Sequence, residues 1–313
     1  MIRRAMLAVA GAVLLAGACQ TLDPFTFSNE PVEDYGWDDD PCDPQLQGEI
    51  TEAEHRLAGG PAPSCHPSQV SADLRHEGFV SLEDGRKIHY VYAHRPDALT
   101  TIFYSHGTSR HLGRYWDRVE LMWSWGYNVM IYDYPGYGRS EGEPDQAGIY
   151  ESAQAVLERI LPDMPGVDLD RVVFMGYSLG GAPTYELASL AHTGDLAVVP
   201  QGVVTEAAFC SNEALIQDGS RLDLPLEFLS DNPFDNCAAI ARLDPDLPVL
   251  IMHGEADDFI VPLQAHMLRD AAVGNDVTLF LVPGADHSEA PVAGGELYDQ
   301  TLREFLDRVA PAP

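Results

Sequence analysis

The chain has 313 residues, of which 45% are hydrophobic and 21% are charged, a balance typical of a globular protein. Its 49 acidic and 18 basic residues give a net charge of −31. A surface this acidic repels nucleic-acid phosphates and anionic lipid headgroups. The composition therefore argues against a nucleic-acid partner and against electrostatic attachment to a membrane.

The first residues have the pattern of an export signal. A short basic stretch precedes an apolar run from Ala5 to Ala16, which has the length of a signal peptide. The sequence LLAGACQ resembles a bacterial lipobox with Cys19 as the acylated residue, and Gln20 favours outer-membrane sorting by the same resemblance. The A-x-A pattern before Cys19 also fits ordinary cleavage. We predict a signal peptide over residues 1–18 and a periplasmic outer-membrane lipoprotein anchored through Cys19, with a secreted soluble protein as the alternative.

Four further cysteines form an even set, which in an oxidising compartment predicts disulfides. Of the three possible pairings, Cys42–Cys65 with Cys210–Cys237 is favoured because each pair lies in one local segment. Free buried thiols are the alternative. No pair has the C-x-x-C spacing of a zinc site, so no metal is predicted.

The chain divides at about residue 78. Residues 19–77 are rich in Pro, Asp and Glu and predict a tether and a loosely ordered N-terminal arm, with one short helix over 50–57. The elements expected after it, in chain order, are two strands within 78–96 with a turn at 83–85, a strand at 100–107, a helix at 112–124, a strand at 127–134, a helix at 145–161, a strand at 171–176, a helix at 181–191, a strand within 197–207, a strand at 247–254, a helix at 263–272, a strand at 277–284 and a helix at 296–309.

This alternation of apolar strands with helices predicts an α/β fold, in which a mostly parallel central sheet is covered by helices on both faces. One connection, at about 207–246, is much longer than the others. Connections of this length inside a compact domain are usually lids or insertions, so we predict a small cap within a domain that covers 78–313.

At the ends of three of the expected strands lie side chains of the types that act in catalysis. Ser178 follows the strand at 171–176 between glycines, the sequence HGEADD comes at the end of the strand at 247–254, and PGADH comes at the end of the last strand. Ligands of open parallel sheets bind at the carboxyl ends of strands, and Ser…Asp…His is the chain order of α/β-hydrolase triads. Ser178 is the expected nucleophile and His287 the expected base, with a carboxylate to hold the imidazole.

The motifs SHGT, DYPGYGRSEGEP, GYSLGG, HGEADDFIVP and PGADH, in this order, resemble the α/β-hydrolase superfamily over about residues 78–310. They are similar in particular to its monoacylglycerol-lipase-like and Bem46-like serine hydrolases. The resemblance implies that Asp257, in the HG-x-x-D pattern, is the triad acid, with Asp258 as the second choice. It also implies an oxyanion hole from the backbone N–H groups of Leu179 and Thr108.

The other polar residues of these motifs have simpler expected roles. His106 and His253 are expected to pack under the site, and Asp133 and Tyr134 to shape a turn. The whole pattern predicts a serine hydrolase that cleaves a carboxylic ester or related small-molecule acyl compound, with no metal or organic cofactor. A thioesterase or serine peptidase is the alternative enzyme, and a non-catalytic ligand- or partner-binding envelope protein is the alternative from another class. The sequence sets no oligomeric state.

Overall fold

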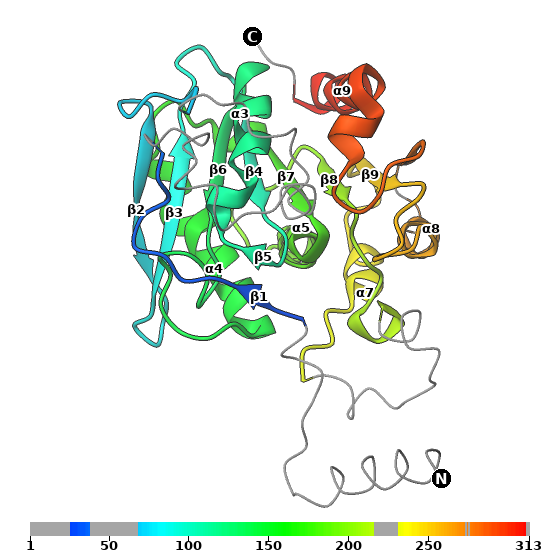
Figure 1. Ribbon diagram of the computed structural model, residues 1–313, viewed down its shortest axis with the longest axis horizontal. Coiled ribbons are helices and arrows are strands. Elements are labelled where there is room, and N and C mark those ends of the chain that lie inside the picture. Colours follow the sequence, from blue (N-terminus) through cyan, green and yellow to red (C-terminus); the bar gives the residue numbers. More distant parts are fainter. Residues whose placement is uncertain (1–25, 38–67, 216–230, 273, 275, 311–313) are drawn as a thin grey trace, which may run out of the picture.

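The computed structural model describes residues 26–37, 68–215, 231–272, 274 and 276–310. The predicted signal peptide, Cys19, the helix at 50–57 and the Cys42–Cys65 pair lie outside the described residues. An eight-stranded sheet organises the described part of the chain (Figure 1), in the order β10-β9-β8-β7-β4-β6-β3-β2.

The sheet is mostly parallel, as the sequence predicts. Strand β3 is antiparallel to both of its neighbours, β2 and β6, and the other adjacent pairs are parallel. The strands are β2 (Arg75–Ser81), β3 (Lys87–Ala93), β4 (Thr101–Ser105), β6 (Asn128–Tyr132), β7 (Val172–Tyr177), β8 (Val203–Glu206), β9 (Val249–Gly254) and β10 (Val277–Val282). The carboxyl ends of β4, β6, β7, β8, β9 and β10 therefore meet along one edge.

Helices cover both faces of this sheet (Figure 1). They are α3 (Trp116–Ser124), α4 (Gln146–Arg159), α5 (Gly181–Thr193), α7 (Asn236–Ile240), α8 (Leu263–Ala271) and α9 (Ala290–Val309). Side chains of α3 and α9 belong to one apolar core, and those of α4, α5, α7 and α8 belong to another. The start of α4 is fixed by Asp145, whose side chain accepts a hydrogen bond from the Gly148 amide at 2.7 Å.

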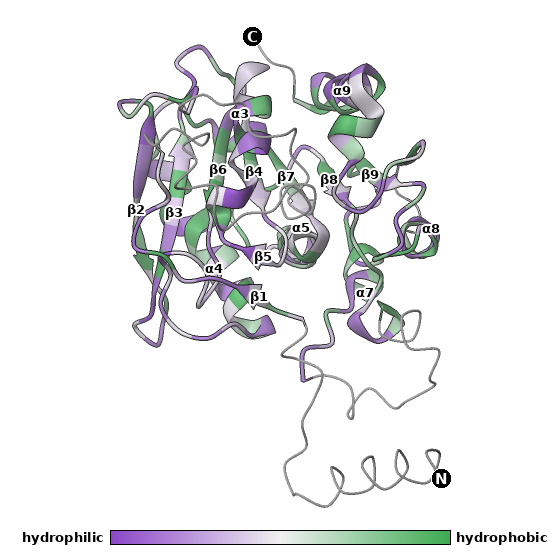
Figure 2. Ribbon diagram, in the orientation of Figure 1, coloured by the Kyte–Doolittle hydropathy of each residue, from purple (hydrophilic) through white to green (hydrophobic). Residues whose placement is uncertain are grey.

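Alternation along the strands supplies both cores. In β4, Ile102 and Tyr104 join the core under α3 and α9, while Phe103 between them joins the opposite core. Strands β6 and β7 alternate in the same way and are buried along their whole lengths. Figure 2 shows hydrophobic colour on these central strands and mostly hydrophilic colour on the edge strand β2.

Two boundaries differ from those that the sequence predicts. Strand β2 begins at Arg75, before the expected domain start at residue 78, because its polar, half-exposed residues give no apolar signal. Helix α9 begins at Ala290 rather than 296 and is interrupted at Gly295, whose φ of 47° is not helical. Gly294 and Gly295 interrupt the helical spacing of apolar residues, so the hydrophobic pattern does not indicate the first turns of this helix.

Part of the predicted arm is folded against the domain. Strand β1 (Ser28–Asn29) pairs in parallel with β5 (Ser109–Arg110) in a small second sheet. The predicted loose arm is thus ordered over 26–37, through backbone hydrogen bonds that leave no pattern in the sequence.

The long connection between β8 and β9 is joined to itself by the predicted Cys210–Cys237 disulfide, which closes a sequence separation of 27 residues. The Cys237 amide also donates to the Cys210 carbonyl at 2.8 Å. Residues 216–230 of the expected cap lie outside the described residues. None of the helices in the described ranges has both the length and the apolar character needed to cross a bilayer.

Loss of this disulfide should reduce stability. Cross-linking a loop of this length restricts the unfolded chain, which stabilises the fold by about 3 kcal/mol. We expect the Cys210→Ser, Cys237→Ser double variant to lose about that much free energy of unfolding, as measured by urea denaturation. Dithiothreitol should destabilise the parent chain by about this much more than it destabilises the double variant, in which only the predicted Cys42–Cys65 pair remains to be reduced. A parent chain with equal stability with and without reductant contradicts the expectation.

Candidate active site

Ser178 lies at a strained turn between β7 and α5. Its φ of 52° is in the left-handed region, which is unusual for a residue other than glycine. Glycines make the turn sterically possible: a Cβ on Gly176 would collide with the Gly180 carbonyl, and a Cβ on Gly180 with the Ser105 carbonyl. The apolar strand followed by G-x-S-x-G therefore places the Ser178 hydroxyl at the carboxyl edge of the sheet.

The structure brings the three predicted triad side chains together from three loops. The His287 Nε2 atom is 3.2 Å from the Ser178 hydroxyl oxygen, and its Nδ1 atom is 2.8 Å from the Asp257 Oδ2 atom. All three residues are buried. Asp258, the second choice for the acid, is exposed and does not take part in this chain of hydrogen bonds.

These contacts define how the imidazole can act. Because Nδ1 faces a carboxylate, it carries the ring proton and donates a hydrogen bond to Asp257. The Nε2 atom then has a free lone pair that can accept the Ser178 hydroxyl proton. The arrangement is that of a serine nucleophile, a general base and an orienting acid.

Asp257 is held as a carboxylate by several donors. Its Oδ1 atom accepts hydrogen bonds from the amides of Phe259 at 3.0 Å and Ile260 at 2.8 Å. Its Oδ2 atom lies 3.2 Å from the Nε2 atom of His253 as well as close to His287. Burial alone raises the pKa of Asp257, but hydrogen bonds from His253 and His287 and their charges outweigh burial and hold the pKa at about 2.

Two aromatic residues hold His287 in place. The Tyr177 hydroxyl donates to the His287 carbonyl at 3.2 Å, and the Phe259 ring meets the imidazole edge-on with centroids 4.9 Å apart. Phe259 is nevertheless 61% exposed, so it forms part of the rim of the site. Sequence reasoning missed Phe259, although its place two residues after the acid in HGEADDFIVP was a signal that could have found it.

A buried ion pair between Arg118 and Glu206 packs against the Tyr177 ring. The Arg118 guanidinium lies over the Tyr177 ring, 4.3 Å from its centroid, and makes two hydrogen bonds of 2.7 and 2.9 Å with Glu206. The Tyr298 hydroxyl donates to the same carboxylate at 2.7 Å. This network joins α3, β8 and α9 under the strand that carries Ser178.

The two predicted oxyanion donors come from neighbouring loops. Leu179 follows Ser178 directly, in the short 3₁₀ turn (Ser178–Gly180) that precedes α5. Thr108 lies in the loop after β4, and β4 pairs with β7 so that Ser105 is opposite Gly176. Close contact of Gly180 with the carbonyls of Ser105 and His106 keeps this loop beside the nucleophile turn. The predicted donors therefore lie in two neighbouring segments beside the nucleophile turn.

His253 has a more direct contact with the site than sequence reasoning gave it. It is buried and its Nε2 atom is 2.6 Å from the Ile260 carbonyl, which fixes the loop that presents Asp257. In the described ranges, no group of three or more His, Cys, Asp or Glu side chains is arranged to hold a metal ion.

Several known proteins are similar to this chain in sequence or in structure. The family described as "Serine aminopeptidase, S33" matches residues 96–226, which include Thr108 and Ser178. The uncharacterized protein YfhR of Escherichia coli strain K12 is 26% identical over 212 residues, 67% of this chain and 71% of that protein. The α/β hydrolase domain-containing protein WAV2 of Arabidopsis thaliana is 31% identical over 193 residues, 59% of this chain and 62% of that protein.

Among solved structures, the esterase Pf2001 of Pyrococcus furiosus matches with a TM-score of 0.63 at 17% identity, covering 75% of this chain and 91% of that one. A mostly parallel sheet with a serine, a histidine and an aspartate joined at its carboxyl edge defines the α/β-hydrolase class of protein. The chain has the α/β-hydrolase fold, and the family match together with these relatives supports a hydrolase of the α/β-hydrolase superfamily.

The depressed pKa of Asp257 predicts a pH-dependent contribution to stability. Because the folded pKa of about 2 is below the ordinary value of 3.8, this contribution is fully present above pH 3.8 and is lost as the pH falls towards 2. We expect Asp257→Asn to lower the free energy of unfolding at pH 7 by about 2 kcal/mol, a deficit that narrows below pH 4.

Chemical denaturation of the parent and the variant between pH 3 and 7 measures this difference. The matched control is Asp258→Asn, which removes the exposed neighbouring carboxylate and should change stability little at any pH. An equal loss in both variants, or a deficit for Asp257→Asn that does not depend on pH, would contradict this account of the carboxylate.

Proposed function

We propose that the protein is a serine hydrolase that cleaves a carboxylic ester or related small-molecule acyl compound through an acyl-Ser178 intermediate. The observation that carries the proposal is the chain of hydrogen bonds from Ser178 through His287 to Asp257. An isolated serine in a tight turn needs no imidazole at hydrogen-bonding distance, and an isolated histidine needs no buried carboxylate on its far nitrogen.

In the first half-reaction, the Ser178 hydroxyl oxygen attacks the substrate carbonyl carbon while His287 Nε2 takes the hydroxyl proton. The C=O electron pair moves to oxygen, and the backbone N–H groups of Leu179 and Thr108 are the donors for this oxyanion. When the tetrahedral intermediate collapses, the imidazolium returns its proton to the departing alcohol oxygen. The acyl group remains on Ser178 as an ester.

In the second half-reaction, water replaces the alcohol. His287 takes a proton from the water as its oxygen attacks the acyl carbon, and then returns a proton to Ser178 as the carboxylic acid departs. Asp257 remains ionised throughout because its pKa of about 2 is far below neutrality, so it stabilises the imidazolium in both half-reactions.

Two features bear on the alternatives. The complete hydrogen-bonded triad disfavours a binding protein that uses the fold without its chemistry. The match to a serine aminopeptidase family keeps a peptidase as the second candidate, since an amide passes through the same intermediates. The lipid anchor at Cys19 and the periplasmic location are proposals that rest on the LLAGACQ sequence alone.

Covalent labelling tests the nucleophile. A fluorophosphonate probe should label Ser178 in the parent chain, as peptide mapping by mass spectrometry would show, and should not label Ser178→Ala. The same variant should lose p-nitrophenyl ester hydrolysis almost completely and keep the circular dichroism and melting temperature of the parent. Ester hydrolysis that is unchanged in Ser178→Ala would remove the proposal.

Steady-state kinetics test the acid. Asp257→Asn should lower kcat by up to about 10⁴-fold, since an amide cannot hold the required imidazole tautomer, whereas Asp258→Asn should keep nearly all activity. A panel of esters of increasing acyl length, a thioester and an aminoacyl amide then separates esterase, thioesterase and peptidase. Faster turnover of the amide than of the esters would favour the peptidase.

A further inference from the structure

The N-terminal segment 26–37 lies along the loop that carries Thr108. We define the oxyanion loop as residues 106–112, between β4 and the turn that leads into α3. Ser28 and Asn29 pair with Ser109 and Arg110 of this loop in parallel register. A segment about eighty residues away in the sequence is thus placed as a short strand on the outer side of the oxyanion loop.

The contact is closest at Thr108 itself. The Thr108 hydroxyl donates to the Thr26 carbonyl at 2.7 Å and accepts from the Ser28 amide at 3.2 Å. The Tyr137 hydroxyl lies 3.1 Å from the same oxygen. The side chain of the predicted oxyanion donor is therefore occupied by the N-terminal segment, which leaves its backbone amide as the group available to a substrate.

Further bonds continue past Thr108. The Glu30 amide donates to the Arg110 carbonyl at 2.9 Å, and the Glu30 carboxylate is 3.2 Å from the Arg110 guanidinium. Arg110 has a φ of 59°, a conformation that is unfavourable for a non-glycine residue and persists only when its surroundings enforce it. The paired segment supplies part of that enforcement.

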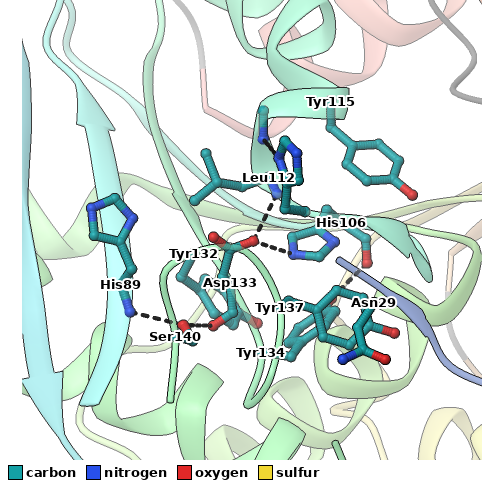
Figure 3. Close-up of polar contacts among 12 residues, drawn as sticks. Asn29, His89, His106, Leu112, Tyr115, Tyr132, Asp133, Tyr134, Tyr137 and Ser140 are labelled. Atoms are coloured by element: carbon teal, nitrogen blue, oxygen red, sulfur yellow. Dashed lines mark hydrogen bonds and ion pairs between the residues drawn. The ribbon is translucent and has the colours of Figure 1, made fainter. Parts of the chain in front are cut away.

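Tyr35 is connected to both ends of the same loop through Asp133. Its hydroxyl donates to Asp133, a fully buried carboxylate at the end of β6. The other oxygen of Asp133 accepts the Leu112 amide at 2.7 Å and lies 3.4 Å from the His106 Nε2 atom. Figure 3 shows Asp133 between His106 and Leu112, which are the first and last residues of the oxyanion loop.

The protonation states suit these contacts. Burial, and after it the negative charge of Asp133, raises the pKa of Tyr35, so its hydroxyl keeps the proton that it donates. Burial alone raises the pKa of Asp133, but hydrogen bonds from His106, Tyr35 and the Leu112 amide outweigh it and lower the pKa, so the carboxylate stays ionised.

We propose that the N-terminal segment 26–37 is a positioning element of the active site, which holds the Thr108 amide in place for the oxyanion through Thr108's side chain and through Tyr35 and Asp133. This inference rests on the proposed function and extends it to residues outside the catalytic motifs. The Thr108 side chain and Tyr35 do not touch the reacting atoms; they act through the backbone of the oxyanion loop.

Two single substitutions in the full chain test the proposal. Thr108→Val keeps the branched shape and the backbone amide but removes all three hydrogen bonds of the side chain, with Thr26, Ser28 and Tyr137. Tyr35→Phe keeps the ring but removes the bond to Asp133. Tyr127→Phe is the matched control, because it deletes a tyrosine hydroxyl bonded to Asp307 at 3.1 Å, at the start of β6 and away from the site. Glu33→Gln changes an exposed residue of the same segment.

We expect both test variants to lower kcat by about ten- to a hundredfold with little change in KM, since small misplacements of catalytic groups are this costly. Affinity for a trifluoromethyl ketone, which forms an oxyanion with Ser178, should fall by a similar factor. Both controls should keep the parent kcat. Assays are run well below each melting temperature, and the folded fraction is checked by circular dichroism. A fall in activity then cannot be caused by unfolding.

An unchanged kcat and an unchanged ketone affinity in both folded test variants would overturn the proposal. A rise in KM alone would also overturn it, since that result indicates a role in substrate binding rather than in oxyanion stabilisation. An equal fall in Tyr127→Phe would show a general effect of stability and would likewise overturn it. Fluorophosphonate labelling of Ser178 in the parent is measured first, so failure of the proposed hydrolase would be recognised separately.

Discussion

The turn at Ser178 is the constraint on which the rest of the site depends. A serine at a φ of 52° is held there only because Gly176 and Gly180 allow β7, the turn and β4 to approach more closely than any side chain would permit. The strain presents the hydroxyl at the edge of the sheet, and the same close approach places the oxyanion loop beside it. The parallel sheet brings the other two triad residues to the same edge. Strands β9 and β10 run parallel to β7, so the loops that follow them place Asp257 and His287 beside Ser178.

Charge is arranged around this edge in buried pairs. Asp257 lies between two imidazoles, Asp133 lies between His106 and Tyr35, and Glu206 is paired with Arg118. Each buried carboxylate has donors on more than one side, which compensates for the cost of taking it out of water. In a chain with a net charge of −31, these acidic residues are set apart from the others by their role. They fix loops at the carboxyl ends of strands, whereas most other charged side chains of the described ranges are partly or fully exposed.

The fold and the triad could be predicted from sequence because each leaves a local signal. Apolar runs marked the strands, and Ser178, Asp257 and His287 each follow a strand within a short motif. What could not be predicted depends on contacts between distant segments. Nothing in the residues around Tyr35 indicates that it reaches Asp133, and His253 shows no sign in the sequence that it shares Asp257 with His287. Helix α9 was placed too late because the break at Gly295 interrupts its periodicity.

Identifying the residue that carries the covalent intermediate tests the role of Ser178 without relying on a variant. The parent chain would be mixed with p-nitrophenyl butyrate, quenched in acid within the first turnover, digested and analysed by mass spectrometry. We expect one butyryl group on the peptide that contains Ser178, appearing at the rate of the initial p-nitrophenol burst and disappearing as substrate is exhausted. Turnover of the ester with the butyryl group on another residue, or with no acylated peptide at any quench time under burst conditions, would contradict it.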